Sequence, residues 1–259
     1  MNFSRLSSSA EGRVCRITLA CPSKENTLDD ILVAELTQAI VAAAKDPAVK
    51  TVVLAGEGTA FCGGTDLEYL QKLSRFDFSQ NLEDSKNLMK LFHLLYTMRK
   101  PVLAQVQGAA FASGCGLVCA CDIVIASDDA LFGFPEVSLG LIPAVVLTFL
   151  ARKVGEGKAR EMVMTGRTLR ARDAHTCGLV NEVVPGDELE DRVRSVAEGL
   201  CRDGSGSSLG LIKEMFSRMD GLNLPDLLDY AANVGAAMRM SEDCRKGIAG
   251  FLNKEKVQW

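Results

Sequence analysis

The 259-residue sequence has few of the residues on which metal, redox and nucleic-acid sites commonly depend. It contains only two histidines, one tryptophan and three tyrosines, and its 33 acidic residues outnumber its 29 basic residues, for a formal net charge of −4. A net negative chain is not expected to bind nucleic acid, because phosphate recognition requires a concentrated positive field. The composition therefore argues against a nucleic-acid partner.

Long apolar runs are also absent. Charge or glycine interrupts every apolar stretch within about ten residues, whereas a membrane-spanning helix requires about 18–20. Segment 1–19 has one early arginine and lacks the apolar core and small-residue cleavage site of a secretory signal. We therefore expect no membrane partner, no export signal and a cytoplasmic location.

Nine cysteines contrast with the two histidines. In a chain without an export signal they are expected to be reduced thiols and not a disulfide framework. Cys115, Cys119 and Cys121 form the tightest group, but no second Cys or His pair follows at the spacing of a zinc site. We interpret them as small buried apolar residues, and we expect no metal.

The sequence does alternate between short apolar runs and amphipathic segments, with 47% hydrophobic and 24% charged residues, as in globular proteins. Four runs predict strands, most of them covered on both faces: 13–19, 51–56, 102–108 and 123–126. Amphipathic segments predict helices at 27–45, 87–99 and 113–121. This alternation indicates an α/β fold with mostly parallel strands.

Beyond about residue 187 the pattern becomes entirely helical. Apolar residues recur at helical spacing in 189–200, 209–219, 224–238 and 243–252. We therefore predict two parts, an α/β catalytic core over residues 1–186 and a C-terminal helical region over residues 187–259.

Two strand exits are rich in glycine and small residues, at 56–66 and 108–116. In parallel α/β sheets, ligands gather at the carboxyl ends of strands, and the first N–H groups of a helix have no internal partner. N–H groups that converge from both loops could hold a carbonyl oxygen as it gains negative charge. The alternative is that these glycines serve only tight turns and close packing. Neither loop has a nucleotide-binding motif.

Glu136 is the only carboxylate between Asp129 and Glu156, and its neighbours in the segment 132–143 are mostly apolar. Burial of such a carboxylate would raise its pKa toward the range that is useful for general acid and base catalysis. The alternative is a glutamate that reaches solvent or caps a turn. Glu136 is therefore a candidate catalytic residue.

These features together resemble the enoyl-CoA hydratase/isomerase family, or crotonase superfamily, over nearly the whole chain. The matching stretches occur in the family's order and at its separations: Asn26-Thr27-Leu28, AFCGGTDL at 60–67, KPVLAQVQGAAFASGCGL at 100–117, CDIVIA at 121–126, FGFPEVSLGLIP at 132–143 and TGR at 165–167. Ala174 and the Gly-Leu-Val at 178–180 extend the resemblance.

The resemblance implies a spiral of strand–strand–helix turns, with a C-terminal helical region that forms homotrimers or dimers of trimers. It places the two oxyanion-hole N–H donors on Thr65 and Ser113 and the acid/base on Glu136. The implied partner is an acyl-CoA substrate. Coenzyme A is part of that substrate, so no separate cofactor is expected.

The resemblance also implies residues that contact the substrate. Gly63 matches a position whose main chain contacts the adenine, and Lys24, Phe251 and Lys254 resemble positions that hold the CoA, the last two from a neighbouring subunit. The loop residues Gly64, Asp66, Gly114 and Gly116 complete the candidate substrate-binding set. Asp66 is also expected to stabilise a helix N-terminus, and Glu68 and Tyr69 on the same helix are minor candidates.

Two positions depart from the family pattern. Ser113 replaces the usual glycine, although its backbone N–H remains, and Gly116 stands where two-glutamate hydratases carry their first glutamate. Isomerisation of a 3-enoyl thioester needs only one carboxylate, so Gly116 favours a single-base reaction. The stretches around residues 114–123 and 134–145 are instead similar to methylglutaconyl-CoA hydratase and to dehydratases of polyketide β-branching, which resemble single-glutamate hydratases.

The leading hypothesis is therefore an enoyl-CoA hydratase, a lyase of fatty acid metabolism, acting on a 2-enoyl-CoA with a branched or carboxylated acyl group. The alternatives are a Δ3-Δ2-enoyl-CoA isomerase and other enolate chemistry, such as decarboxylation or thioester hydrolysis. A non-catalytic acyl-CoA-binding protein belongs to a different class. The presence of Glu136 argues against it.

Overall fold

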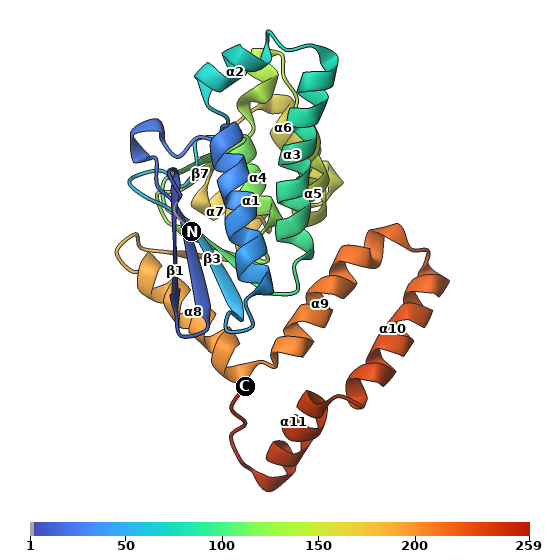
Figure 1. Ribbon diagram of the computed structural model, residues 1–259. Coiled ribbons are helices and arrows are strands. Elements are labelled where there is room, and N and C mark those ends of the chain that lie inside the picture. Colours follow the sequence, from blue (N-terminus) through green and yellow to red (C-terminus); the bar gives the residue numbers. More distant parts are fainter. Residues whose placement is uncertain (1–2) are drawn as a thin grey trace.

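The computed structural model describes residues 3–259 and has a mixed α/β architecture (Figure 1). A six-stranded sheet has the order β1-β2-β3-β4-β6-β9, in which only β1 and β2 pair antiparallel. Its strands are β1 Leu6–Glu11, β2 Val14–Leu19, β3 Thr51–Gly56, β4 Val102–Val106, β6 Ile123–Ser127 and β9 Glu182–Val184. A smaller sheet has the order β5-β7-β8, from β5 Ala109–Phe111, β7 Leu131–Gly133 and β8 Leu169–Arg170.

Helices connect and cover the strands. The α-helices are α1 Asp30–Lys45, α2 Leu67–Leu73, α3 Phe78–Thr97, α4 Ser113–Ala120, α5 Ala144–Val154, α6 Glu156–Thr165, α7 Ala171–Thr176, α8 Leu189–Asp203, α9 Gly206–Arg218, α10 Leu224–Arg239 and α11 Glu242–Asn253. Three short 3₁₀ helices are η1 Pro22–Lys24, η2 Pro135–Leu139 and η3 Met219–Gly221. The predicted parallel α/β arrangement is confirmed.

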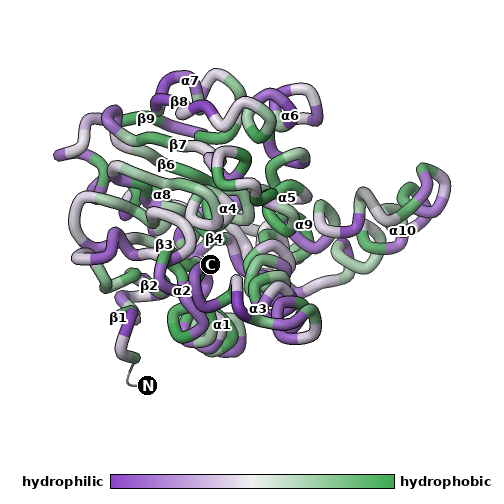
Figure 2. The backbone as a smooth tube through the Cα atoms, turned by 90° about the horizontal axis from the view of Figure 1, so that it is seen from above, coloured by the Kyte–Doolittle hydropathy of each residue, from purple (hydrophilic) through white to green (hydrophobic). Residues whose placement is uncertain are grey.

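The central strands β3, β4 and β6 of the large sheet are buried on both faces, as their apolar sequences predict, whereas the edge strand β1 is largely exposed. Successive side chains of a strand point to opposite faces. Val52 and Leu54 of β3 therefore pack into the core beneath α1, α3 and α4, whereas Val53 packs with Val193 of α8 on the other face. Figure 2 shows α8 alongside the sheet strands. This burial holds in place the strands β3 and β4, from which the two glycine-rich loops emerge.

The C-terminal helices form an arm. Helix α8 belongs to the layer on the sheet, whereas α9, α10 and α11 extend away from the sheets (Figures 1 and 2). The base of the arm is anchored by the buried side chain of Lys213, whose Nζ lies 2.6 Å from Asp122 Oδ2. The predicted run of four helices is confirmed, and the division between residues 186 and 187 stays a prediction.

Two helix starts differ from the sequence pattern. The Thr27 hydroxyl and Asp30 have the spacing of a cap, but α1 begins at Asp30, and the Asp29 carboxylate accepts from the Leu32 N–H at 2.8 Å. Helix α3 begins at Phe78 rather than residue 87, with a capping box between Asp77 and Gln80. The apolar stripe is missing from its first turns because these are solvent-exposed, so periodicity gave no signal there.

Candidate active site

The two glycine-rich loops lie side by side. After β3, the carbonyl of Cys62 accepts a hydrogen bond of 3.1 Å from the N–H of Phe111, which ends β5. Cys62 and Ala110 also form an isolated parallel bridge. A β-carbon built on Gly64 would lie 2.9 Å from the Ala112 Cβ, so the two main chains are in direct contact. The expected meeting of the two strand exits is therefore present.

Thr65 and Ser113 stand opposite each other in these loops. Thr65 Oγ1 lies 3.2 Å from Ser113 Oγ, and Ser113 is only 8% exposed. Across residues 3–259, no described group accepts a hydrogen bond from the main-chain N–H of Thr65 or of Ser113. Two free N–H groups on neighbouring residues are what an oxyanion site requires.

The turn before Ser113 is strained. Ala112 has φ 48° and ψ −124°, a conformation that L-residues rarely adopt, and it directly precedes the first residue of α4. Such strain costs about 1–3 kcal/mol and persists only where the surroundings enforce it. It brings the free N–H at the start of α4 to the end of β5, beside the other loop.

Close packing explains part of the glycine content. A β-carbon on Gly114 would lie 2.2 Å from the Cys62 carbonyl oxygen, and Gly64 has φ +106°. Neither position accepts a side chain without displacement of the neighbouring main chain. The turn-and-packing interpretation thus holds for these two glycines, and it is compatible with free N–H groups at Thr65 and Ser113. Their assignment as substrate-binding stays a prediction.

Glu136 lies in η2, just beyond β7. The residue is half-buried, and its Oε2 atom is buried without a hydrogen-bond partner among the described residues. Burial raises the pKa of Glu136, because desolvation disfavours the charged form. An unpartnered buried carboxyl oxygen carries a free-energy cost, which is typical of groups kept for function and not for folding. The burial of Oε2 favours a catalytic role for Glu136 over a wholly solvent-facing one, and the assignment stays a prediction.

The small sheet positions Glu136 relative to Ser113. Phe111 pairs with Gly133 in the parallel β5–β7 register, and the N–H of Ala112 donates to the Gly133 carbonyl at 2.9 Å. Ser113 and Glu136 follow these paired residues within three positions of each strand end. Glu136 also contributes, after burial and Cys119, to the raised pKa of the Cys115 thiol in the first turn of α4. The Glu136 carboxylate therefore lies near the first turn of α4.

Gly116 has no room for an acidic side chain. A β-carbon there would lie 2.5 Å from Val146 Cγ2 and 2.9 Å from Phe92 Cε1. Apolar side chains of α5 and α3 fill the space that a glutamate at residue 116 would occupy. The sequence around residue 116 gave no indication of these contacts. Glu136 is consequently not paired with a second carboxylate at this position. The role of Gly116 in substrate binding stays a prediction.

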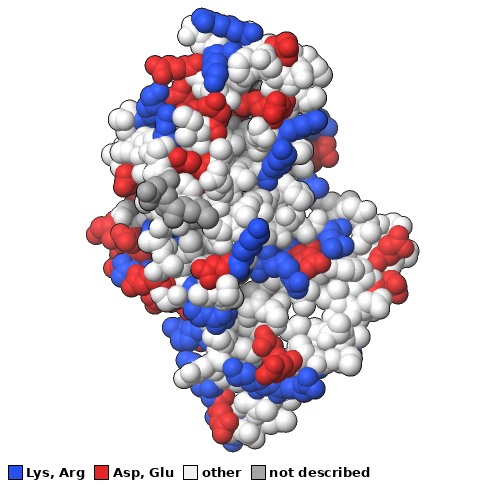
Figure 3. Space-filling view, viewed as in Figure 1, with Lys and Arg blue, Asp and Glu red and all other residues white. Residues whose placement is uncertain are grey.

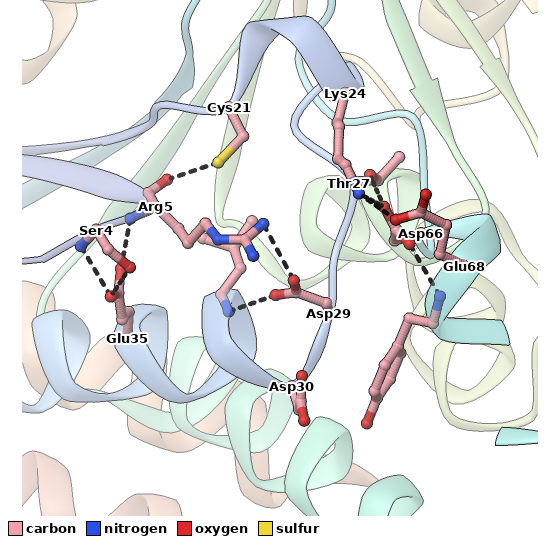
Figure 4. A network of polar contacts seen from close by, with 12 residues as sticks. Ser4, Arg5, Cys21, Lys24, Thr27, Asp29, Asp30, Glu35, Asp66 and Glu68 are labelled. Carbon is pink, nitrogen blue, oxygen red and sulfur yellow. Dashed lines mark hydrogen bonds and ion pairs between the residues drawn. The ribbon is translucent and has the colours of Figure 1, made fainter. Parts of the chain in front are cut away.

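Asp66, which follows Thr65 at the end of the first glycine-rich loop, forms a polar cluster with Lys24 (Figure 4). The Asp66 carboxylate caps α2 by accepting from the Tyr69 N–H at 2.9 Å, as the sequence predicts. Lys24 Nζ lies 3.1 Å from Asp66 Oδ2 and 2.8 Å from Glu68 Oε2. Although burial acts to raise it, the pKa of Asp66 is lowered overall by the Tyr69 N–H and Lys24.

The other CoA candidates differ in place. The Gly63 N–H donates to the Glu25 carbonyl at 2.8 Å, which joins the first glycine-rich loop to the turn that follows Lys24. Phe251 is 85% exposed on α11, and Lys254 directly follows this helix, in the arm far from α2 in Figure 1. A single chain therefore does not bring Phe251 and Lys254 to Thr65 and Ser113, so any contact there requires a neighbouring subunit.

The metal-ligating residue types, the cysteines and the two histidines were also candidates for other kinds of site. Within residues 3–259, no group of three or more His, Cys, Asp or Glu side chains is placed to hold a metal ion. The nine cysteines are free thiols. His175 Nδ1 lies 3.0 Å from the Val180 carbonyl, a structural contact, and His93 is exposed on α3 instead of lying on its apolar stripe. On the face drawn in Figure 3, basic and acidic side chains intermingle.

Comparison with known proteins decides the family. Residues 9–259 match the sequence model of the family described as enoyl-CoA hydratase/isomerase. The chain belongs to this family. Its fold is the predicted crotonase-like α/β fold, because a crystal structure of an enoyl-CoA hydratase from Shewanella pealeana matches with a TM-score of 0.94 and 30% identity, over 99% of this chain and 96% of that one.

Two relatives illustrate the range of the family. A Thermus thermophilus protein, provisionally named an enoyl-CoA hydratase, is 36% identical over 94% of this chain and 96% of its own length. The 2,3-dehydroadipyl-CoA hydratase of Escherichia coli is 31% identical over 97% of each chain. The protein is therefore an enzyme of the hydratase/isomerase family.

Sequence reasoning missed two features of this site. It assigned Thr65 and Ser113 only their N–H groups, whereas their hydroxyls also meet; a hydroxyl residue at both donor positions is the signal that could have indicated this. It also gave no account of what fills the space at Gly116. That required the tertiary contacts of Phe92 and Val146.

Proposed function

We propose that the protein catalyses the reversible addition of water to a 2-enoyl-CoA, with Glu136 as its single acid/base. The N–H groups of Thr65 and Ser113 would bind the thioester oxygen. The observation that carries the proposal is the approach of these two residues to 3.2 Å between their side chains, with both N–H groups free. The buried, unpartnered oxygen of Glu136 supports it.

One carboxylate can serve both proton transfers in sequence. Glu136, ionised, takes a proton from water while the water oxygen bonds to C3 and the C2–C3 π electrons move toward the thioester. The resulting enolate oxygen accepts hydrogen bonds from the Thr65 and Ser113 N–H groups. Protonated Glu136 then returns its proton to C2, which restores the carboxylate. Loss of one such donor typically costs about 3–4 kcal/mol of transition-state stabilisation.

Double-bond isomerisation is the second candidate. It needs only a proton shuttle between C2 and C4, and the hydrocarbon contacts of Gly116 with Phe92 and Val146 favour a single-base reaction. Decarboxylation and thioester hydrolysis would use the same oxyanion donors. A non-catalytic acyl-CoA-binding role is less well supported, because it gives no reason for a buried unpartnered carboxyl oxygen at Glu136.

One assay separates these functions. A 2-enoyl-CoA and a 3-enoyl-CoA are supplied separately, and the absorbance of the conjugated thioester is followed. Loss of absorbance from the 2-enoyl-CoA is expected for a hydratase. Gain from the 3-enoyl-CoA, without loss from the 2-enoyl-CoA, would instead establish isomerisation. No change with either substrate, while CoA esters still bind, would reject both.

The acyl group is proposed to be branched or carboxylated. A relative named for 2,3-dehydroadipyl-CoA, at 31% identity, supports this range. A panel of linear, branched and ω-carboxylated 2-enoyl-CoA thioesters tests it through kcat/KM. A preference for linear, uncharged chains would reject it.

No cofactor beyond the CoA of the substrate is proposed, and location in the cytoplasm stays a prediction. Within residues 3–259, no helix has the length and apolarity to cross a membrane.

The assembly is proposed to be a homotrimer or a dimer of trimers. The helical arm exposes large apolar side chains, which isolated chains rarely leave in contact with water: Ile212, Phe216, Leu224, Leu228, Met240, Ile248, Phe251 and Leu252. Sedimentation equilibrium measures the state directly. A monomer at micromolar concentration would reject the assembly and, with it, the part proposed for Phe251 and Lys254 in holding CoA.

A further inference from the structure

The side chains of Thr65 and Ser113 meet at the candidate oxyanion site, although that site needs only their main-chain N–H groups. Their hydroxyl oxygens are 3.2 Å apart, a hydrogen-bond distance. We infer that this hydroxyl bridge fixes the separation of the two loops, so that both N–H groups reach the same oxygen atom. The two side chains are thus positioning groups. The inference rests on the proposed oxyanion function of the site.

Several contacts join the two loops, and the hydroxyl bridge is the last of them along both segments. Main-chain hydrogen bonds connect residues 61–62 to residues 109–111, and Gly64 packs against Ala112. Each of these contacts involves the main chain or a methyl group. By contrast, the contact between Thr65 and Ser113 is made by polar side chains, and it lies nearest their free N–H groups.

The strained turn explains why a restraint is needed there. Ala112 holds φ 48° and ψ −124°, and relaxation of this residue would rotate the following peptide, whose N–H belongs to Ser113. The Ala112 N–H is held by the Gly133 carbonyl on one side of the turn. The Ser113 hydroxyl, held by Thr65, restrains the other side.

Because Ser113 is buried, its hydroxyl has little access to water as an alternative hydrogen-bond partner. Ser113 is 8% exposed, and its hydroxyl has Thr65 as its hydrogen-bond partner in the described part of the chain. Two hydroxyls share one hydrogen in such a pair, which leaves one O–H to donate elsewhere. A glycine at residue 113, as the family resemblance leads one to expect, would supply the N–H without the bridge. The restraint is therefore a property of this chain's own residue pair.

Side-chain variants test the bridge without removing either N–H. Ser113→Ala and Thr65→Val each delete one hydroxyl, and the second preserves side-chain shape. We expect each to lower kcat by about tenfold, with KM changed less than about threefold, because a misplaced donor weakens transition-state binding. The kcat of the double variant should lie within about threefold of the kcat of the less active single variant, because either substitution alone already removes the bridge. Multiplicative losses in the double variant would overturn the inference.

A spectroscopic readout separates positioning from a general structural effect. Bound cinnamoyl-CoA, whose ring is conjugated with the thioester, should absorb at longer wavelength when the two N–H groups polarise its carbonyl. The shift should be reduced in Ser113→Ala and Thr65→Val, and Thr65→Ser should recover it. Ser217→Ala, which removes a hydroxyl bond to the Glu214 carbonyl on α9, is the matched control. An undiminished shift in the bridge variants would overturn the inference.

The same readout distinguishes this inference from the proposed hydration. The absorbance shift depends on the oxyanion donors and not on addition of water. A wild-type protein that shifts the absorbance but hydrates nothing would reject hydration, while the variants would still decide the role of the bridge. A wild-type protein that binds cinnamoyl-CoA without any shift would overturn the bridge itself, since its donors would not converge on the thioester.

Discussion

Gly116 and Val146 lie so close that a β-carbon on Gly116 would stand 2.5 Å from the Val146 Cγ2 atom. This contact joins α4 to α5 and occupies the space in which a second acidic side chain would have to lie. The single-carboxylate character of the site is thus built into the core packing and is not only a consequence of one residue's identity.

The first prediction concerns this contact. Gly116→Ala should destabilise the fold by about 1–3 kcal/mol, because the new methyl group overpacks a filled core. Gly116→Glu should destabilise it further and add no hydratase activity. Urea denaturation measures the free energy of unfolding of each variant. Gly157→Ala on α6 is the control, since nothing lies within 4 Å of its added methyl group. Partial recovery is expected in Gly116→Ala combined with Val146→Ala. Unchanged stability in Gly116→Ala would contradict the packing argument.

The second prediction concerns turnover. Glu136→Gln should lower kcat by at least about 100-fold while the affinity for acyl-CoA stays nearly the same, because the amide keeps the shape but cannot exchange the proton. Steady-state kinetics and calorimetric binding measure the two quantities. The exposed Glu198 on α8, changed to Gln, serves as the control. Near-normal turnover in Glu136→Gln would remove the residue from its proposed role.

The third prediction concerns pH. Burial raises the pKa of folded Glu136 above its ordinary value of 4.5, so the folded state binds the proton more tightly than the unfolded chain does. The free energy of unfolding should then fall as pH rises from about 4.5 through the folded pKa. Glu136→Gln should unfold at a higher temperature than wild type at pH 7.5, and the difference should shrink toward pH 4. A constant difference across this range would show that Glu136 has an ordinary pKa.

The fourth prediction concerns the CoA. Lys24→Ala should raise KM for an acyl-CoA by about threefold to tenfold at low salt, because an exposed ammonium attracts phosphate only modestly. The effect should diminish as ionic strength rises. Lys72→Ala is the matched control, since Lys72 Nζ is also exposed and pairs with Asp30 at 3.1 Å. Equal effects of the two substitutions would indicate general surface charge and not a CoA contact at Lys24.

The sequence by itself determined the class of fold and most of the candidate site. Apolar runs such as Thr51–Gly56, between amphipathic helices, are typical of strands covered on both faces of a parallel sheet, and strand exits rich in small residues identify the two loops. These signals are local, so they can be recognised without coordinates. Its apolar neighbours singled out Glu136 in this way, whereas the family resemblance implied Thr65 and Ser113 as the N–H donors within the two loops. The helix predicted over 27–45 begins instead at Asp30, because the Asp29 carboxylate caps its first turn.

Only the tertiary structure decided how these residues stand relative to one another. The hydroxyl contact between Thr65 and Ser113, the burial of one Glu136 oxygen and the filling of the space at Gly116 by Phe92 and Val146 all join segments far apart in the chain. Such contacts depend on strand register and side-chain packing. No single segment encodes them, because the free energy of each contact depends on the shape and position of both residues that make it.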